Sequence, residues 1–367
     1  MFYRDIRIKS LVLVQLIIPS FYFFVILKNF INVDNFLLAN LVTFCFVSLG
    51  MATLILMGLK LKKHNVILIF IASLFVFSQM LSVLSTNFRV QDGLLSFQYL
   101  GIALVPVFYN LNYKLYKIIN YIIICFFLFQ IIADVSPDVI FSVSRNFISV
   151  VLIIATSYHF ISSYQNDKKP SILMLFLSLF ISIWSMARSG MIVYAMLLIL
   201  YPFMVNYKFH YKIIYLSVLA SFLVLMVYYF AETLFKASIN KLESGGLDDV
   251  RSSMNMDYLN ATLNSSLYIL IGTPLTTIKS MIEVELNPHN SFIRLHLYYG
   301  LFGFLLVLST ICNAVLKYFT RKKYILLVLF TAILFRSAVD STSFHGPFDP
   351  IIFFLIFFPL KHLNLKA

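Results

Sequence analysis

The chain has 367 residues, of which 61% are hydrophobic and 12% are charged, and its formal net charge is +13. Soluble domains carry roughly 25% charged residues, so this chain has about half the charge that a water-facing surface needs. The composition excludes a soluble enzyme, a secreted disulfide-stabilised scaffold and a disordered regulator. It predicts an all-α, polytopic integral membrane protein, with a single transmembrane domain over residues 1–367.

Twelve apolar segments are candidates for membrane-spanning helices. A helix needs roughly 20 apolar residues to cross ~30 Å of hydrocarbon. The last segment is the weakest of the twelve, because Pro347 and Asp349 interrupt its start. The segments are 8–27, 36–57, 66–84, 94–110, 118–133, 147–163, 171–187, 190–206, 213–231, 293–316, 324–339 and 344–360.

Lysine and arginine accumulate on one side of these twelve segments. When the N-terminus is placed in the cytoplasm, the inner segments contain 18 cations and two acids, whereas the outer segments contain 10 cations and 13 acids. Cytoplasmic loops of membrane proteins carry an excess of Lys and Arg. The distribution therefore predicts that both termini are cytoplasmic and that an even number of spans separates them.

One outer connection, 232–290, is much longer than the others. It contains several acidic and glycine residues, followed by a semi-apolar stretch of 14 residues at 265–278. That stretch is too short to cross the bilayer, so we expect it to lie along the membrane face or to re-enter. Long loops on a compact scaffold tend to carry function. The sequence therefore predicts that this loop contributes to a functional site.

Four arginines adjoin the outer ends of predicted spans, and a fifth lies in the long loop. An arginine near hydrocarbon tends to face the bundle interior or a wet cavity, although a single one can instead extend to lipid headgroups. Arginine keeps its proton, and its planar fork binds two phosphate oxygens at once. The group therefore suggests an anionic lipid headgroup, such as a pyrophosphate, as ligand. The five are Arg145, Arg188, Arg251, Arg294 and Arg336.

A histidine stands just before the tenth predicted span, in the sequence NPHNS at 287–291. Asn290 or the serine after it can cap the following helix, which places His289 at the outer mouth of the bundle. Histidine titrates near neutral pH and can accept a proton from a hydroxyl group. The alternative is a loop histidine bonded only to backbone. We expect His296 to be an interior packing residue, and His345 is a second outer candidate.

The chain lacks the motifs that mark cofactor and metal sites. It has no GxxxxGK[ST] phosphate-binding loop and no acidic cluster with the spacing of a metal cage, so we expect neither a metal nor a cofactor. Cys45, Cys125 and Cys312 fall in apolar segments without metal-ligand spacing, and we expect them to be buried small hydrophobic residues. The basic residues form short clusters between apolar segments, so the net charge does not indicate a nucleic-acid partner.

Three stretches, in a fixed order, resemble motifs of the O-antigen polymerase and O-antigen ligase superfamily of bacterial surface-polysaccharide assembly. The first is WSMARSG at 184–190, which is similar to the family's Ser-Arg-Ser/Thr-Gly turn, with alanine where serine is frequent. The second runs from Arg251 to Gly272, like the family's arginine and glycine-containing turn. The third is PHNSF at 288–292 followed by YGLFG at 299–303, which resembles a His-Asn segment and a Gly-x-x-Gly helix.

The resemblance implies an enzyme that joins glycans at the periplasmic face of the bacterial inner membrane, with a fold like that of the membrane-embedded GT-C-like glycosyltransferases. The donor in that family is an oligosaccharide on polyprenyl pyrophosphate. Because the donor already has a good leaving group, the protein has to position two glycans and stabilise the departing charge. The implied partners are this lipid-linked oligosaccharide, membrane lipids and a chain-length regulator protein.

The same resemblance implies roles for single residues. It assigns the pyrophosphate to Arg188 and Arg251, with Arg145 and Arg336 as further candidates. His289 would be the base for the attacking sugar hydroxyl, or an orienting donor to it, and Asn290 would hold its geometry.

Three functions stay open at this level. A polymerase is preferred, because the outer loop is modest and the ends of the chain are compact. A ligase would instead transfer the finished glycan to lipid A-core. A flippase for lipid-linked oligosaccharide would place charges along a central path and have two related halves. The interiors of the first five predicted spans contain no charge, and the sequence shows no internal repeat.

Overall fold

The computed structural model describes residues 2–30, 36–58, 90–142, 144–221, 224, 247–282 and 288–361. Within these ranges all regular secondary structure is helical, as the composition predicts. Residues 209–221 form one of the helices. The others are α1 (Phe2–Phe30), α2 (Phe36–Gly58), α4 (Val90–Phe108), α5 (Tyr113–Ile132), η2 (Pro137–Val139), α6 (Asn146–Gln165), α7 (Ile172–Trp184), α8 (Arg188–Met204), α10 (Leu247–Leu263), α11 (Ser266–Ile271), η3 (Leu275–Thr277), α12 (Lys279–Ile282), α13 (Ser291–Thr320), α14 (Tyr324–Val339) and α15 (Asp349–Lys361), where η marks a short 3-10 helix.

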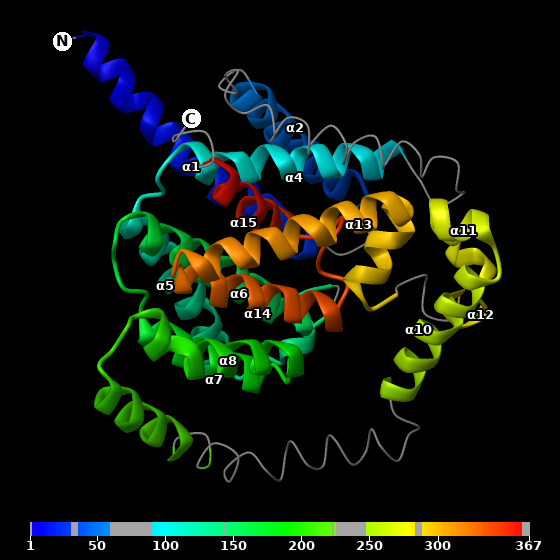
Figure 1. Ribbon diagram of the computed structural model, residues 1–367. Coiled ribbons are helices and arrows are strands. Elements are labelled where there is room, and N and C mark those ends of the chain that lie inside the picture. The colour runs from blue at the N-terminus through cyan, green and yellow to red at the C-terminus, as the bar shows by residue number, and fades with distance from the viewer. Residues whose placement is uncertain are drawn as a thin grey trace.

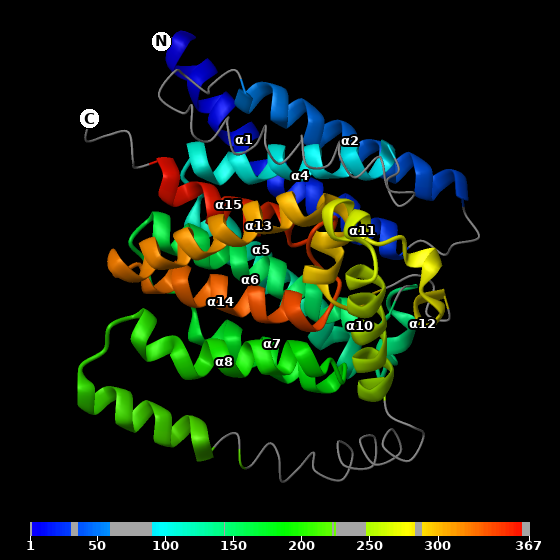
Figure 2. The ribbon, with the colours of Figure 1, turned by 45° about the vertical axis from the view of Figure 1, so that its right-hand side comes forward.

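Most of the long helices lie side by side, so the connections between them fall at two opposite ends of a bundle (Figures 1 and 2). α1 begins and α15 ends at one of these ends, which we call the terminal end (Figure 1). α10, α11 and α12 lie at the opposite end, which we call the loop end. Successive helices alternate in direction, so α6, α8, α13 and α15 begin at the loop end, and α5, α7 and α14 finish there.

Five helical stretches are long and apolar enough to cross a membrane, and five further apolar helices have 10–17 residues. This confirms the prediction of a membrane protein built from helices. The five long stretches are Val12–Phe30, Leu37–Gly58, Tyr113–Ile132, Asn146–Gln165 and Ser291–Thr320.

The number of twelve spans stays a prediction. The segment 66–84 and most of 213–231 lie outside the described residues. The last predicted span is wrong in its start, because residues 344–348 form a non-helical turn and the helix begins only at Asp349.

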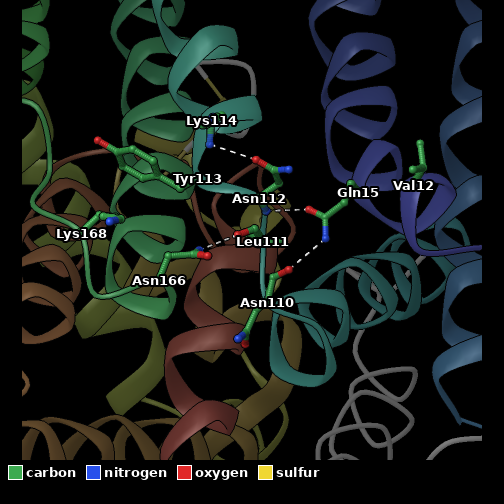
Figure 3. Close-up of a pocket in the computed structure, with 9 residues that line it drawn as sticks. All are labelled: Val12, Gln15, Asn110, Leu111, Asn112, Tyr113, Lys114, Asn166 and Lys168. Carbon is green, nitrogen blue, oxygen red and sulfur yellow. Dashed lines mark hydrogen bonds between the residues drawn. The ribbon is translucent and has the colours of Figure 1, made fainter. Parts of the chain in front are cut away.

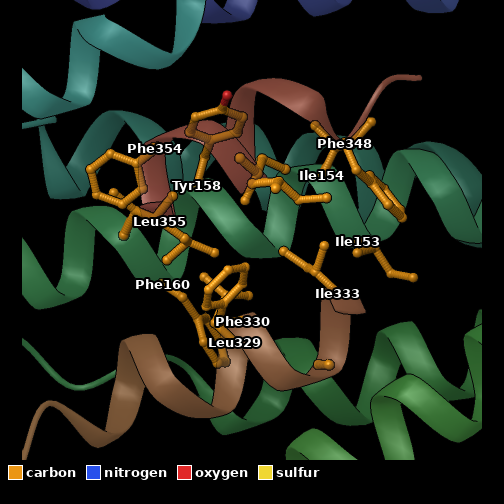
Figure 4. Close-up of a cluster of buried hydrophobic side chains, with 14 of the residues drawn as sticks. Ile153, Ile154, Tyr158, Phe160, Leu329, Phe330, Ile333, Phe348, Phe354 and Leu355 are labelled. Carbon is orange, nitrogen blue, oxygen red and sulfur yellow. The ribbon is translucent and has the colours of Figure 1, made fainter. Parts of the chain in front are cut away.

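Helix α6 runs through the centre of the bundle, where its side chains meet those of α14 and α15 (Figure 4). Ile153 and Phe160 of α6 are buried in one cluster with Phe330 of α14 and Phe354 of α15. Small polar residues on α6 let neighbouring backbones approach closely. Their hydroxyl groups bond within the helix: Ser157 Oγ donates to the carbonyl oxygen of Ile153 at 2.6 Å. The hydroxyl groups of Ser157, Ser162 and Ser163 on α6 thereby have backbone partners within the helix.

Large apolar side chains also cover the outside of the bundle. Leu37 and Ile132 are 79% and 82% exposed, respectively. An apolar surface of this extent marks contact with a membrane. The prediction that the cysteines are buried is wrong for Cys125 and Cys312, which are exposed, and Cys45 is half-buried. A lipid-facing position is as apolar as an interior one, so composition does not distinguish them.

The described part of the loop 232–290 folds into α10, α11 and α12. The semi-apolar stretch 265–278 forms α11 and η3 within it. Met254 and Tyr258 of α10 are buried against Leu297 of α13 in a small second core. The apolar residues of the loop therefore hold it against the end of the bundle.

Candidate functional site

The structure brings most of the predicted site residues to the loop end. Arg145 directly precedes α6, Arg188 is the first residue of α8, and Arg336 lies in the last turn of α14. His289 and Asn290 directly precede α13. Because α6, α8 and α13 begin and α14 finishes at this end, residues from four distant parts of the chain share it (Figure 2). Arg251 belongs to α10, which lies at the same end, but its side chain is outside the described residues.

Asn290 caps helix α13. It was one of the two residues predicted for this role, together with the serine that follows it. Its side-chain oxygen accepts hydrogen bonds from the backbone N–H groups of Phe292, at 2.8 Å, and Ile293, at 3.3 Å. The half-buried residue before it, His289, has a φ of 46°. This left-handed conformation is uncommon for residues other than glycine, although histidine is among those that adopt it more often. The cap and the backbone conformation of His289 together set the direction in which the chain enters α13.

The start of α13 is tied to the connection that follows α14. Ser291 Oγ donates to the carbonyl oxygen of Asp340 at 2.6 Å and accepts from the backbone N–H of Ser343 at 3.0 Å. One turn later, Arg294 Nη1 donates to the carbonyl oxygen of Ser341 at 3.1 Å. These bonds hold the His-Asn segment against residues about 50 positions further along the chain.

Arg336 is completely buried and forms an ion pair with Asp340, with 2.9 Å between Nη2 and Oδ2. The carboxylate of Asp340 is 23% exposed. A buried arginine needs such a partner, because an uncompensated charge away from water is costly. The pair links the last turn of α14 to the first residue of the connection that follows it. Ser291 and Arg294 form hydrogen bonds to the same connection. Arg336 therefore has a structural role in addition to any role toward a ligand.

Arg145 and Arg188 have more accessible environments. Arg145 Nη1 lies 3.5 Å from Asp138 Oδ2, and both side chains are partly exposed. Arg188 is exposed on the first turn of α8. A Cβ atom at Gly190 would lie 2.5 Å from Cβ of Ser149, so the first turns of α8 and α6 are in close contact. The two arginines therefore flank neighbouring helix starts.

His296 is an interior packing residue, as expected. Its Nδ1 lies 2.8 Å from the hydroxyl of Tyr258, and its Nε2 lies 2.9 Å from the carbonyl oxygen of Ile269. The carbonyl can only accept, so Nε2 carries the proton and Nδ1 accepts from the tyrosine hydroxyl. Burial raises the pKa of Tyr258 to about 12, so this hydroxyl keeps its proton. The imidazole thereby connects α10 and α11 to α13.

His345, the second outer candidate, is buried in a tight turn. Its ring stacks on Tyr299, with 5.5 Å between centroids, and lies 4.4 Å from the ring of Tyr298. The carboxylate of Asp349 accepts the backbone N–H groups of His345, at 2.7 Å, and Gly346, at 3.1 Å. In the sequence, Asp349 stands out only as a charged residue that interrupts the last predicted span. The carboxylate instead folds the preceding residues into a turn that starts α15.

Two glycines from separate motifs meet where α11 packs on α13. Gly272 has a φ of 94° and Gly300 has a φ of 60°, and the latter kinks α13. A Cβ atom at Gly272 would lie 2.5 Å from the carbonyl oxygen of Leu297. One at Gly300 would overlap the carbonyl oxygen of Leu270. Both positions therefore require glycine, because two backbones touch there.

The loop end carries both cationic side chains and a histidine. The partly exposed guanidinium groups of Arg145, Arg188 and Arg294 can bind phosphate oxygens, and half-buried His289 can exchange a proton with a sugar hydroxyl. Among the described residues no three His, Cys, Asp or Glu side chains gather as a metal site. Asp340 was not among the predicted site residues, although its position four residues after Arg336 is a recognisable ion-pair signal.

No protein-family model, curated protein or solved structure with which the chain was compared matches it.

Proposed function

We propose that the chain is an O-antigen polymerase, a membrane glycosyltransferase that joins oligosaccharide repeat units carried on polyprenyl pyrophosphate. The observation that supports it is the convergence of His289, Arg188 and Arg145 at one end of a membrane helix bundle. Glycan transfer from such a donor needs cations for the departing pyrophosphate and a nearby group that accepts the hydroxyl proton.

The proposal includes a placement in the membrane. The loop end faces the periplasm, both termini are cytoplasmic, and the chain crosses the bacterial inner membrane twelve times in a GT-C-like architecture. The cations at the terminal end support this orientation, since Lys and Arg concentrate in cytoplasmic connections. Those on described helices and turns include Lys114, Lys168, Lys208, Lys317, Arg321 and Lys322.

The proposed reaction is a displacement at the anomeric carbon of the donor sugar. A hydroxyl oxygen of the acceptor glycan forms a bond to this carbon, and the bond from the carbon to the pyrophosphate oxygen breaks. The pyrophosphate departs with the electron pair. The hydroxyl proton passes to His289 or, where His289 only orients the hydroxyl, to an oxygen of the departing pyrophosphate.

Arg188 and Arg251 are the proposed ligands of the departing pyrophosphate. Arg145 and Arg336 are weaker candidates, because each already faces a carboxylate, at 3.5 Å and 2.9 Å respectively. Neither a metal nor a cofactor is part of the proposal. The proposed partners are the lipid-linked oligosaccharide, membrane lipids and a chain-length regulator.

Two other functions compete with this one. An O-antigen ligase would use the same donor site and transfer the glycan to lipid A-core. A flippase would move the lipid-linked unit across the bilayer, and needs polar groups along a path between the two ends. The proposed ligand-binding residues instead lie at the loop end alone, which favours reaction at a surface over transit.

The surface-glycan profile of a deletion strain distinguishes the three. We expect lipid A-core capped by a single repeat unit, which indicates a polymerase. Uncapped core with full-length polymer still on the carrier lipid would indicate a ligase. Single carrier-linked units that accumulate on the inner leaflet would indicate a flippase.

A further inference from the structure

A pocket of about 750 Å³ opens at the terminal end (Figure 3), whereas the residues of the proposed reaction lie at the loop end. It lies between α1, the connection from α4 to α5, and the residues that follow α6. Its volume falls in the range of small-molecule sites. The lining residues are Val12, Gln15, Asn110, Leu111, Asn112, Tyr113, Lys114, Asn166 and Lys168.

Amide side chains hold the wall of this pocket in place. Gln15 Nε2 donates to the carbonyl oxygen of Asn110 at 2.9 Å, and its Oε1 accepts from the backbone N–H of Asn112 at 2.8 Å. Asn166 Nδ2 donates to the carbonyl oxygen of Leu111 at 2.7 Å. The connection between α4 and α5 is therefore fixed from both sides, and Figure 3 shows these bonds.

The pocket is positively charged. Lys114 and Lys168 both line it, and both are exposed. The acid closest in sequence, Asp167, is not among the lining residues. Basic pockets between transmembrane helices on the cytoplasmic side bind anionic lipid headgroups.

A second, apolar pocket of about 210 Å³ continues along the same helices. On α1 it begins at Ile18, one turn after Gln15, and on α5 it begins at Tyr116, one turn after Tyr113. The floor comes from α6, with Ile154 among its residues. The two pockets therefore succeed one another along α1 and α5, from the end of the bundle toward its middle. We call this pair of neighbouring pockets the seam.

Pro19, which lines the apolar pocket, leaves one backbone carbonyl oxygen of α1 without its helical partner. Proline has no backbone N–H, so the helix cannot satisfy the carbonyl oxygen of Gln15 four residues earlier, and prolines bend helices at such points. The hydroxyl of Tyr116, from α5, donates to this carbonyl oxygen at 3.3 Å instead. The two helices are thereby connected through one long side chain beside the apolar pocket.

We propose that this seam binds one phospholipid with an anionic headgroup. The phosphate lies between Lys114 and Lys168 with the amide groups around it, and one acyl chain occupies the apolar pocket beside Tyr116. The combination of a basic mouth and an apolar continuation fits a lipid better than a soluble anion, which would use the mouth alone. The site is separate from the proposed glycan-transfer residues, and it rests on the proposed function only for the cytoplasmic placement of the terminal end.

The test uses the full-length protein, purified in neutral detergent and mixed with equal amounts of phosphatidylglycerol and phosphatidylcholine that carry identical acyl chains. Mass spectrometry measures the lipid retained per protein after washing. We expect clear retention of phosphatidylglycerol over phosphatidylcholine. The variant Lys114→Gln/Lys168→Gln should retain at least about tenfold less phosphatidylglycerol, because each lysine near an anionic headgroup contributes on the order of 1 kcal/mol.

The matched control is Lys208→Gln/Lys322→Gln, which removes two exposed cations at the same end outside the pocket. It should retain phosphatidylglycerol like the unchanged chain. Equal retention of both lipids by the unchanged chain, or an equal loss in the control, would overturn the proposal. Displacement of the lipid by millimolar inorganic phosphate would overturn it as well, since the site would then be one for free anions. Lys114 and Lys168 are exposed, so their replacement should leave the fold intact, and a loss confined to this variant assigns the retained lipid to the pocket.

Discussion

Arg188 and Arg336 follow the same pattern in the sequence, each at the outer end of an apolar segment, but the structure gives them different environments. Arg188 is exposed on the first turn of α8. Arg336 is fully buried beside Asp340. A cation that is already paired inside the protein must lose its partner before it binds a ligand, whereas an exposed one loses only water. The two arginines are therefore expected to respond differently to substitution.

Removing Arg336 should destabilise the fold itself. Breaking a buried ion pair by deleting one partner costs about 3–5 kcal/mol, because the other charge stays behind. Arg336→Ala and Asp340→Ala should each lower the thermal unfolding temperature in detergent. The double variant Arg336→Leu/Asp340→Leu should recover part of the loss, since it leaves no unpaired charge. Single variants with unchanged stability would show that the pair contributes nothing.

His289 should be required for activity and not for folding. In a strain that depends on this chain, His289→Ala should abolish glycan lengthening at an unchanged protein level, because the acceptor hydroxyl loses its base or orienting group. His210→Ala is the control, as this exposed histidine follows α8 at the terminal end. Normal lengthening by His289→Ala would remove this residue from the mechanism.

At the scale of elements, helix α13 connects the loop end to the bundle. Its first turn is capped by Asn290 and bonded to the connection after α14. Its next turns carry His296, which bonds α10 and α11, and Gly300, where the helix is kinked. The kink lets the backbone of α11 contact that of α13. The His-Asn segment at 288–292 and the segment YGLFG at 299–303 are therefore parts of one structural unit.

Gly300→Ala should detach α11 from this unit. Gly300 has φ 60° and ψ −172°, a region that only glycine adopts freely, and other residues pay on the order of 1–3 kcal/mol for it. A methyl group would also meet the carbonyl oxygen of Leu270. We expect faster limited proteolysis between residues 247 and 282 and lower activity.

Gly58→Ala is the control for this substitution, because a Cβ atom there meets nothing within 4 Å. It should leave proteolysis and activity as they are. An equal effect of both substitutions would show that the close contact of α11 with α13 is unimportant.

At the scale of the whole molecule, the bundle separates two chemical surfaces. The loop end contains the candidate glycan-transfer residues, and the terminal end contains the basic pocket between α1 and α5. The apolar exterior lies between them. The positive-inside distribution of the sequence predicts that the terminal end faces the cytoplasm.

The orientation is testable with single cysteines in a chain whose three native cysteines are replaced by serine. One variant is Val139→Cys, at the loop end, where the native valine is 72% exposed. The other is Arg321→Cys, in the exposed turn after α13. A thiol reagent that cannot cross the inner membrane should label the first in spheroplasts and the second only after lysis. The reverse pattern would invert the proposed topology.

Hydropathy and charge along the chain were enough to predict a helical membrane protein, the positions of most helices and the common end of the bundle at which the candidate residues lie. The physical reason is that hydrocarbon imposes a local requirement: roughly 20 apolar residues for each crossing, with cations left at the ends. Any window of the chain reveals whether it meets this requirement. This requirement did not predict the start of α15, because hydrogen bonds from the preceding backbone N–H groups to the carboxylate of Asp349 set that boundary.

The partners of the candidate residues and the places where backbones touch became known only from the packed structure. Arg336 pairs with Asp340, Gly300 meets Leu270, and the pocket at the terminal end combines α1 with residues near 110 and 166. Partners of this kind depend on the directions in which packed helices bring their side chains together. That information arises only when elements distant in the chain pack, so no local pattern contains it.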